Sequence, residues 1–460
     1  MSKRVGLPIA AALLLFWAWS VPAVEMKAGT AKGVITPGPD KALISVMGKP
    51  LEGVEHDIFS RVLVLDDGAH RLIIVANDLN CLDVATPILR ERLKNEFGTD
   101  PAYFVPLATH NHAAPIQIVP GNFDYGRWLA ERIFGLIKEA IANEQGPAQV
   151  QFGFGSEYCL KCMGNAPIDS EIQVLKVTSG DKVLAVLFNQ ATHPMQTGSK
   201  AIEVGHPGYA VDEVESRLPG VLALYADACG GNQFTSRGMK ASIENVKAFA
   251  HQVADRALAI SQGPMQDVTG PIASKLEVIS LPLAKPIPRE DAEKLAASIP
   301  KDIGLVPYPD KNRSKNWVRA LLKCYQQNIP FPTKSDEWVC TDDAFLVKEY
   351  ETPRAYPCRY EETITAKIGP LVFVAMQGEV CAPIGMRIKD AFRSETPIMV
   401  CAYMGEHNLY IPTREIVRLG LYQAQVIQTQ YACPVGWAPE VEDDMVTGVT
   451  RMITALMQQP

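Results

Sequence analysis

Residues 103–115 read YFVPLATHNHAAP, in which a short apolar run is followed at once by two histidines. The run Tyr103–Leu107 predicts a buried β-strand. In an extended backbone, residues two positions apart face the same side, so His110 and His112 are expected to converge at the carboxyl end of that strand. Sheets of α/β proteins place their sites at this end. Such a pair can also cap a loop or satisfy buried contacts, and that alternative stays open.

A second apolar strand ends in the same way. Residues 184–194 read LAVLFNQATHP, so a Thr-His pair again follows a buried strand and His193 lies at its carboxyl end. A third apolar strand, Leu371–Met376, is followed by Gln377-Gly378-Glu379. Glycine permits close backbone approach, and a carboxylate here can complete a zinc site with two imidazoles. The alternative for Glu379 is a favourable charge at the N-terminus of the next helix.

Strand and helix patterns alternate along most of the chain. The turn Asp66-Asp67-Gly68 joins two apolar runs and predicts a hairpin. No internal sequence repeat is visible. The pattern predicts an α/β protein with mixed sheets flanked by helices. The predicted strands are 61–65, 72–76, 103–107, 183–188, 221–225, 276–281, 362–368, 371–376 and 398–402, and the predicted helices are 89–97, 128–143, 246–260 and 443–457.

The composition is that of a globular protein. The chain has 460 residues, of which 47% are hydrophobic, so it can bury a large core. Its formal net charge is −7, and no basic face is apparent that could displace counterions from phosphates. We therefore expect no nucleic-acid partner.

The N-terminus resembles an export signal. Ser2-Lys3-Arg4 supplies positive charge, Leu7–Val21 is almost wholly apolar, and Val21-Pro22-Ala23 offers small residues for cleavage. The alternative is a membrane anchor, but the apolar run is shorter than the roughly 20 residues that span a bilayer. We therefore predict a cleaved signal peptide at residues 1–23, a mature chain without a transmembrane segment, and a secreted or periplasmic location.

Ten cysteines suit an oxidising compartment, where disulfides are the first expectation. Cys324, Cys340 and Cys358 lie in a polar stretch where a disulfide would help most, although sequence does not reveal the pairing. Cys381 and Cys401 lie in apolar runs and are predicted to be core thiols. Cys159 and Cys162 form a single CxxC pair, for which a structural disulfide or simple burial is favoured.

The mature chain is interpreted as one large domain, residues 24–460. Gly263–Pro271 is a candidate boundary between two lobes. Residues 285–358 are irregular, charged and rich in proline, and strands resume after them. We therefore interpret that segment as an insertion at the mouth of the site.

Several of these elements together resemble the neutral (non-lysosomal) ceramidase family. The family's Thr-His-x-His-x-x-Pro signature matches Thr109–Pro115, and the resemblance extends from about Ala28 to Gln423. The other landmarks occur in family order: Ala31–Pro37, Gly53–Asp57, Asn189–Pro194, Ala228–Asn232, Gln377–Glu379 and Leu409–Thr413. The resemblance implies a neutral-ceramidase-like catalytic domain, here without a C-terminal immunoglobulin-like domain.

Carried over by position, the resemblance implies zinc ligands at His110, His193, Glu379 and Tyr410. His112 and Tyr422 then match residues that line the site beside the metal and the substrate. The implied reaction is metal-assisted amide hydrolysis. His112 would shuttle protons, and Tyr410 and Tyr422 would donate hydrogen bonds to the developing oxyanion. Alternatives from residue pattern alone are an interface aromatic for Tyr410 and core filling for Tyr422.

The sequence departs from the family at several points. Ala113-Ala114 replaces the usual Ser-Gly, the usual Gly-Asp is altered around Gly230-Gly231-Asn232, and Gly205 stands where an acidic residue is common. These departures weaken the prediction of ceramide as the substrate more than the prediction of zinc-dependent hydrolysis. His206 is a candidate site residue, although a bystander in a loop is favoured. His56 is a candidate for contacting residues that line the site, and His407 is a candidate for lining the pocket. His70 and His251 are predicted to have structural roles.

Three functions follow from these patterns. The first is an exported zinc amidase acting on ceramide or another N-acyl lipid, which leaves contact with a membrane surface open. The second is a zinc amidase or esterase for a soluble, non-lipid substrate. The third is a non-catalytic exported binding protein on the same fold, suggested by the altered glycine-rich loop. Retention of all four ligand-type residues argues against the third.

Overall fold

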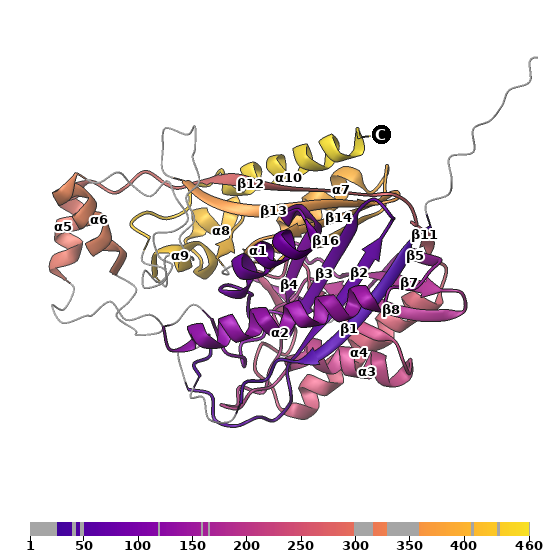
Figure 1. The fold of residues 1–460 in the computed structure, drawn as a ribbon. Helices are drawn as coiled ribbons and strands as arrows, with labels where there is room; N and C mark the ends of the chain where they lie inside the picture. Colours follow the sequence, from indigo (N-terminus) through magenta and orange to yellow (C-terminus); the bar gives the residue numbers. More distant parts are fainter. Residues whose placement is uncertain are drawn as a thin grey trace, which may run out of the picture.

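The computed structural model describes residues 25–38, 43–46, 50–117, 120–157, 160–163, 166–298, 316–328, 358–405, 409–429 and 433–459. The predicted signal peptide, Cys159, Cys340 and His407 lie outside these residues, as does part of the predicted insertion. The described part forms three similar α/β units arranged around one central core (Figure 1). Each unit has an antiparallel three-stranded ladder, a crossover helix, a parallel fourth strand and a closing helix.

Unit 1 spans residues 27–142 and has the strand order β1-β2-β3-β4. β1 and β2 are antiparallel, β2 and β3 form the predicted hairpin, and β3 and β4 are parallel. α1 connects β3 to β4, and α2 follows β4 and packs on β1 and β2. The bounds are β1 Lys27–Val34, β2 Phe59–Asp66, β3 Arg71–Asn77, α1 Ala85–Phe97, β4 Phe104–Ala108 and α2 Phe123–Ala142, with short 3-10 turns at Pro101–Tyr103 and Pro120–Asn122.

Unit 2 spans residues 148–262 and repeats this arrangement. β5, β7 and β8 form the antiparallel ladder, α3 is the crossover, β9 is parallel to β8, and α4 closes the unit. The bounds are β5 Ala148–Ser156, β7 Glu171–Ser179, β8 Lys182–Gln190, α3 Gly205–Arg217, β9 Leu222–Asp227 and α4 Ile243–Gln262. The two-stranded β6–β10 ladder and the edge strand β11 are additions, at Leu160–Cys162, Gln233–Thr235 and Gln266–Asp267.

Unit 3 spans residues 272–457 and has the same pattern again. β12, β13 and β14 are antiparallel, α7 is the crossover, β16 is parallel to β14, and α10 runs along β12 and β13 (Figure 1). The bounds are β12 Ile272–Pro282, β13 Cys358–Ile368, β14 Leu371–Met376, α7 Ala382–Phe392, β16 Ile398–Cys401 and α10 Val441–Met457. Additional elements are α5 Arg289–Ala297, α6 Asn316–Gln327, β15 Glu379–Val380, β17 Tyr410–Ile411, α8 Arg414–Leu419 and α9 Tyr422–Thr429.

The apolar patterns of the strands explain this architecture. Each of the three sheets is apolar on both faces, as expected for sheets that are covered on both sides. The inner faces of all three sheets meet in one core, which includes Leu63, Ile74, Leu175, Leu187, Phe373 and Met399. The outer faces pack against α1 and α2, α3 and α4, or α7 and α10. The repetition is structural, and the absence of a sequence repeat had concealed it.

Edge strand β16 is covered by amide side chains from unit 2. Gln173 accepts a hydrogen bond from the backbone N–H of Val400 and donates one to the carbonyl of Ile398, at 3.0 and 2.7 Å. Asn189 donates to the Val400 carbonyl at 2.9 Å. These bonds join units 2 and 3, so they fix the positions of the carboxyl ends of the parallel strands of the two units relative to each other.

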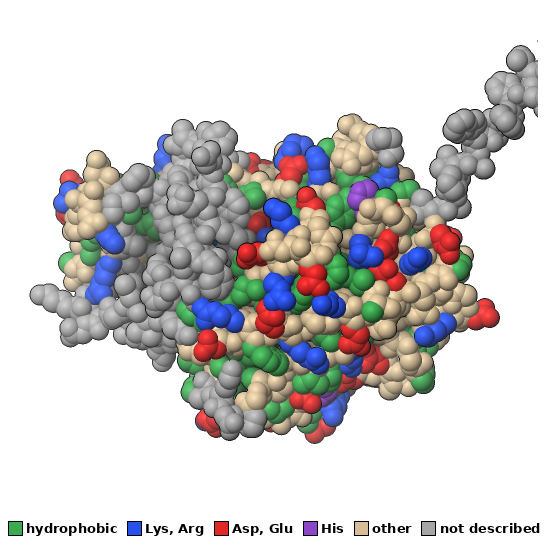
Figure 2. All heavy atoms as spheres, viewed as in Figure 1, with side chains coloured by type: hydrophobic (Ala, Val, Ile, Leu, Met, Phe, Trp, Pro, Cys, Tyr) green, Lys and Arg blue, Asp and Glu red, His purple; other side chains and the backbone are tan. Residues whose placement is uncertain are grey.

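Most predicted elements are confirmed. The ends of most predicted strands agree with the observed ends within one or two residues, and those of the helices agree within a few residues. Five of the described cysteines, Cys81, Cys162, Cys229, Cys381 and Cys401, are free thiols, so none of them supports the predicted disulfides. Cys381 and Cys401 are fully buried, as predicted. No helix in the described ranges is both long and apolar enough to cross a bilayer. Lys, Arg, Asp and Glu are interspersed over the visible described surface (Figure 2), without a basic face.

Candidate metal centre

The four residues implied as metal ligands lie together at the carboxyl ends of the parallel strands. His110 follows β4, His193 follows β8 and Glu379 follows β14, so each of the three sheets contributes one of these residues. Tyr410 is the register partner of Glu379 in the short parallel pair β15–β17. Residues that are up to 300 positions apart are therefore brought to one point by the three-unit arrangement.

The donor atoms converge closely. Glu379 Oε2 lies 3.1 Å from His110 Nε2 and 3.0 Å from His193 Nε2. His193 Nε2 is also 2.9 Å from the hydroxyl of Tyr410, and His112 Nε2 is 2.9 Å from His110 Nε2. His110, His112 and His193 form a group with metal-ligand spacing. The rings of His110 and His193 meet edge to face, with centroids 4.8 Å apart.

The convergence of His110 and His112 was predicted, but the proposed reason was wrong. The prediction assumed an extended backbone, whereas His110 has φ +55° and lies in the left-handed region. This conformation is uncommon for a residue with a side chain and is held only where the surroundings impose it. The chain turns immediately after β4, and this turn directs both imidazoles to the same point.

The loop before Glu379 shows why Gly378 is needed. Gly378 has φ +86°, and a Cβ there would lie 2.6 Å from the carbonyl oxygen of Leu409. Glycine therefore lets this loop pair with the Tyr410 strand. Glu379 does not cap the following helix, because α7 begins after Cys381 and the amide oxygen of Asn232 accepts the Ala382 N–H at 2.8 Å.

The altered glycine-rich loop packs tightly around the site. A Cβ on Gly230 would lie 2.8 Å from the backbone nitrogen of Thr192, and one on Gly231 would lie 2.2 Å from the carbonyl oxygen of Glu379. The Gly231 N–H donates to the Val380 carbonyl at 2.9 Å. Close packing thus explains why both positions are occupied by glycine.

The electrostatics favour a charged carboxylate at Glu379. Burial alone would raise the pKa of Glu379, but His110 and His193 outweigh it and hold that pKa far below its ordinary value. Burial lowers the pKa of His110, and lowers that of His112 strongly. Burial, together with the nearby Glu379, raises the pKa of Tyr410. Neutral imidazoles and a carboxylate are the protonation states in which these groups bind metals.

The donor set fits a cation. His193 Nδ1 lies 2.8 Å from the carbonyl oxygen of Gly230, which can only accept, so the single proton of a neutral imidazole is on Nδ1. In that tautomer the lone pair of His193 Nε2 faces Glu379 Oε2, a buried oxygen without a hydrogen-bond partner among the described residues, and a cation between the two atoms would satisfy both. Ligand atoms in a tetrahedral zinc site with bonds of 2.0–2.1 Å are roughly 3.3 Å apart, close to the distances here.

Two further residues border this centre. Tyr422 is half-exposed, and its ring meets that of Tyr410 edge to face, with centroids 5.7 Å apart. Tyr403 was not predicted: its ring packs on His110 at 4.5 Å, and φ is +55°. No signal in the sequence singled it out. His112 is partly exposed, whereas His110 and His193 are buried, so His112 and Tyr422 lie on the open side of the centre.

The other histidines in the described residues, His56, His70, His206 and His251, lie away from the centre. His206 is buried, its Nδ1 accepts the Met195 N–H at 2.9 Å, and its ring contacts Phe249, so its role is structural. His56 pairs with Asp212 at 2.7 Å, and His70 stacks on a tyrosine. His251 lies with Glu213 and Asp255 in an acidic cluster on α3 and α4, separate from the histidine group. Arg217 already pairs with both carboxylates there.

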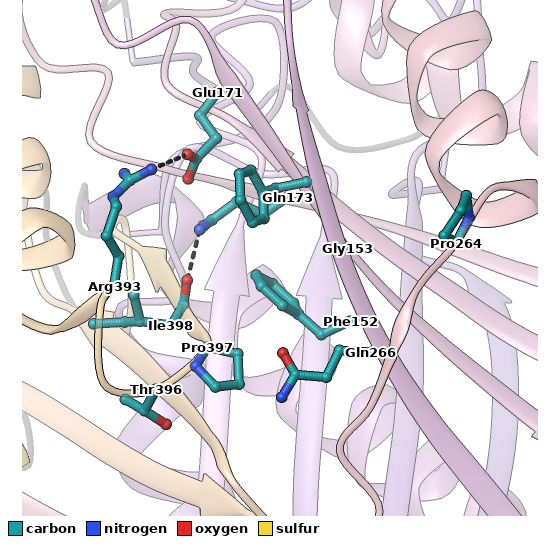
Figure 3. A pocket seen from close by; sticks show the side chains of 11 residues that line it. Phe152, Gly153, Glu171, Gln173, Pro264, Gln266, Arg393, Thr396, Pro397 and Ile398 are labelled. Atoms are coloured by element: carbon teal, nitrogen blue, oxygen red, sulfur yellow. Dashed lines mark hydrogen bonds and ion pairs between the residues drawn. The ribbon is translucent and has the colours of Figure 1, made fainter.

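A separate hollow of about 290 Å³ lies between units 2 and 3, beside Phe152, Gln173 and Pro397 (Figure 3). Its one arginine, Arg393, is paired with Glu171 at 3.1 Å. The hollow contains no histidine, and none of its lining residues belongs to the convergent set. It is therefore not the chemical centre.

Comparison with known proteins supports the same architecture. Neither a protein-family model nor a curated protein sequence matches the chain. The structure of neutral ceramidase from Pseudomonas aeruginosa superposes with a TM-score of 0.68 at 16% identity, covering 94% of this chain and 74% of that one. A ceramidase complexed with C2 gives a TM-score of 0.69 at 16% identity, with coverages of 95% and 76%. The chain therefore has the α/β fold of neutral ceramidase.

Proposed function

We propose that this protein is an exported zinc-dependent hydrolase that cleaves an amide bond in ceramide or another N-acyl lipid. The observation that carries the proposal is the convergence of His110 Nε2 and His193 Nε2 on Glu379 Oε2, at 3.1 and 3.0 Å, where that buried oxygen has no hydrogen-bond partner among the described residues. Three imidazoles and a carboxylate in one buried place are a typical zinc donor set. The likeness of the fold to neutral ceramidase favours amide chemistry over the other reactions that such a centre supports.

His110, His193, Glu379 and Tyr410 would hold the metal. When bound, Zn²⁺ supplies a water of lowered pKa and polarises the scissile carbonyl. The open side of the centre carries His112, whose imidazole would take a proton from the water and return it to the leaving amine. The hydroxyl groups of Tyr410 and Tyr422 would donate hydrogen bonds to the oxyanion. The products are a carboxylate and an amine.

The substrate is assigned to the lipid class for two reasons. The fold is that of neutral ceramidase, and the exposed side chains of Leu419 and Tyr422 lie at the adjacent ends of α8 and α9, where the Tyr422 ring meets that of Tyr410. Such side chains suit the alkyl part of an N-acyl lipid or a membrane surface that delivers it. Export is proposed from the N-terminal sequence and is tested by determining the N-terminus of the protein recovered outside the cytoplasm.

The decisive experiment begins with the metal content of the purified protein. We expect about one zinc per chain, and its loss in His110→Ala and His193→Ala variants whose circular dichroism is unchanged. Wild-type protein without stoichiometric zinc would overturn the proposal. Release of fatty acid from a short-chain fluorescent ceramide is then compared with cleavage of soluble N-acyl amino acids and esters. Cleavage of the soluble compounds alone would replace lipid with a soluble substrate, and zinc without any cleavage would contradict amide hydrolysis.

A further inference from the structure

The chain directly after β16 joins strand ends from all three units. The Ala402 N–H donates to the carbonyl of Asp227, the last residue of β9 in unit 2, at 2.9 Å. The Tyr403 N–H donates to the Gly378 carbonyl in unit 3 at 3.1 Å. The Tyr403 carbonyl accepts the N–H of Ala108, the last residue of β4 in unit 1, at 3.2 Å. Tyr403 therefore lies where the three units meet.

Both backbone bonds of Tyr403 lead to segments that carry proposed ligands. Gly378 directly precedes Glu379, and Ala108 lies two positions before His110. The peptide groups of Tyr403 thus hold these two segments at a fixed separation. The 3.1 Å contact between His110 Nε2 and Glu379 Oε2 depends on that separation.

Tyr403 also has an uncommon backbone conformation. Three non-glycine residues in the described ranges have positive φ, namely His110, Asn328 and Tyr403, and φ is +55° at both His110 and Tyr403. A left-handed conformation is unfavourable for a residue with a Cβ, so it persists only where the surroundings impose it. The rings of His110 and Tyr403 contact each other, with centroids 4.5 Å apart. Such strain gathers at functional sites, and here two strained residues are direct neighbours.

The side chain of Tyr403 is fully buried against the imidazoles. Its ring is tilted by 35° to the ring of His110 and meets that of His193 edge to face, with centroids 6.4 Å apart. The Tyr403 hydroxyl has no hydrogen-bond partner among the described residues. Because burying such a hydroxyl is unfavourable, the hydroxyl does not explain why this side chain is here. The aromatic ring is the part that contacts the site.

We propose that Tyr403 is a positioning residue whose ring holds the imidazole of His110 in place, with Nε2 towards Glu379 and the metal. This inference rests on the proposed zinc site, but not on the identity of the substrate. Ligands keep a productive geometry when packing locks their side chains. The alternative is that Tyr403 only fills the core of unit 3, in which it also packs.

The first test measures zinc affinity by competition with a chromophoric chelator. Tyr403→Leu stays apolar but lacks the ring, and we expect it to bind zinc roughly 10-fold more weakly than wild type. Tyr403→Phe keeps the ring and is expected to retain most of the affinity. Equal losses in these two variants would overturn the inference, because the hydroxyl would then be the part that matters.

Tyr403→Gly separates the ring from the backbone. Glycine adopts a φ of +55° without strain, so the backbone bonds can persist while the ring is lost. We expect this variant to bind zinc as weakly as Tyr403→Leu. Wild-type affinity in Tyr403→Gly would overturn the inference, because the backbone alone would then hold the site.

The matched control separates zinc binding from folding. Tyr125 on α2 is also a buried tyrosine, with 1% of its surface exposed, and it packs in the outer core of unit 1. Tyr125→Leu should lower stability in urea, as Tyr403→Leu does, but leave zinc affinity unchanged. Equal zinc affinity in Tyr125→Leu and Tyr403→Leu would assign Tyr403 to core filling and overturn the inference.

A second measurement reports the geometry of the site directly. The visible absorption spectrum of cobalt-substituted protein depends on the number and arrangement of the ligands. We expect Tyr403→Leu to change this spectrum and Tyr125→Leu to preserve it. A wild-type spectrum in Tyr403→Leu would contradict the inference while leaving the metal site intact. If wild-type protein binds neither zinc nor cobalt, the proposed function fails first, so the two failures are distinguishable.

Discussion

Glu379 and Glu361 are two buried carboxylates in unit 3 with opposite surroundings. Glu379 follows β14 and faces two imidazoles, so its pKa is far below the ordinary value. Glu361 lies within β13, fully buried, and neither of its oxygens has a hydrogen-bond partner among the described residues. Burial raises the pKa of Glu361 to about 8, although Arg359 acts in the opposite direction.

The difference shows what turns a buried carboxylate into part of a site. Burial alone favours the neutral acid, which has no reason to attract a cation at neutral pH. Glu379 stays charged because the loops after β4 and β8 bring His110 and His193 to it. Burial identifies neither carboxylate as functional. The convergence of residues from three sheets singles out Glu379.

The largest effect is expected from Glu379→Gln, which keeps the shape and removes the charge. Breaking a buried pair by removing one partner costs roughly 3–5 kcal/mol, so zinc affinity should fall at least ~100-fold and hydrolysis with it. Zinc titration and rate measurements on the same samples check this. Glu361→Gln is the control and should keep wild-type zinc content. Equal zinc affinity in the two variants would remove the distinction between these carboxylates.

Next in size is the pH dependence of stability that Glu361 causes. Its pKa is raised from 4.5 to about 8 on folding, so the folded state binds more protons than the unfolded state between these pH values. The contribution is therefore fully favourable below pH 4.5 and is lost as pH rises through 8, with a loss of about 4 kcal/mol between pH 5 and 8.5. Urea unfolding from pH 5 to 8.5 should show a weaker decline in Glu361→Gln. An identical decline in both proteins would refute the buried, neutral Glu361.

A smaller effect is expected from Gly231→Ala, whose Cβ would meet the Glu379 carbonyl oxygen at 2.2 Å. We expect a loss of roughly 1–3 kcal/mol in unfolding free energy and weaker zinc binding, because the loop must move. Gly135→Ala on the exposed side of α2 is the matched control, since no atom lies within 4 Å of its Cβ. That change should stabilise by about 0.5–1 kcal/mol. Similar stabilities for the two variants would show that the loop is not tightly packed.

The smallest effect is expected at the acidic cluster of His251, Glu213 and Asp255 on α3 and α4. His251 is exposed, and Arg217 already neutralises its carboxylate neighbours. His251→Ala should leave zinc content unchanged and alter the unfolding free energy by no more than about 0.5 kcal/mol. Elemental analysis and urea unfolding measure both. Loss of bound zinc in this variant would place a metal on α3 and α4 instead of between the sheets.

The sequence by itself located about half of the secondary structure, missing β1, β5, β7, α3 and α7 among others, and supplied most candidates for the site. Apolar runs and helical periodicity located β2, β3, β14 and α10 because these patterns act over a few residues. The same local reasoning identified His110 and His193 as residues that end buried strands. Tyr410 and Tyr422 came only through resemblance, because an isolated tyrosine carries no local signal.

Tertiary structure alone decided how these pieces meet. The three-unit arrangement, the left-handed turn at His110 and the place of Tyr403 have no counterpart in local sequence pattern. His110 and Glu379 are far apart in the chain, and their 3.1 Å contact exists only because three sheets pack their inner faces together. Packing of side chains distant in sequence fixes that geometry, whereas hydrophobic periodicity reports only which face of each strand or helix is buried.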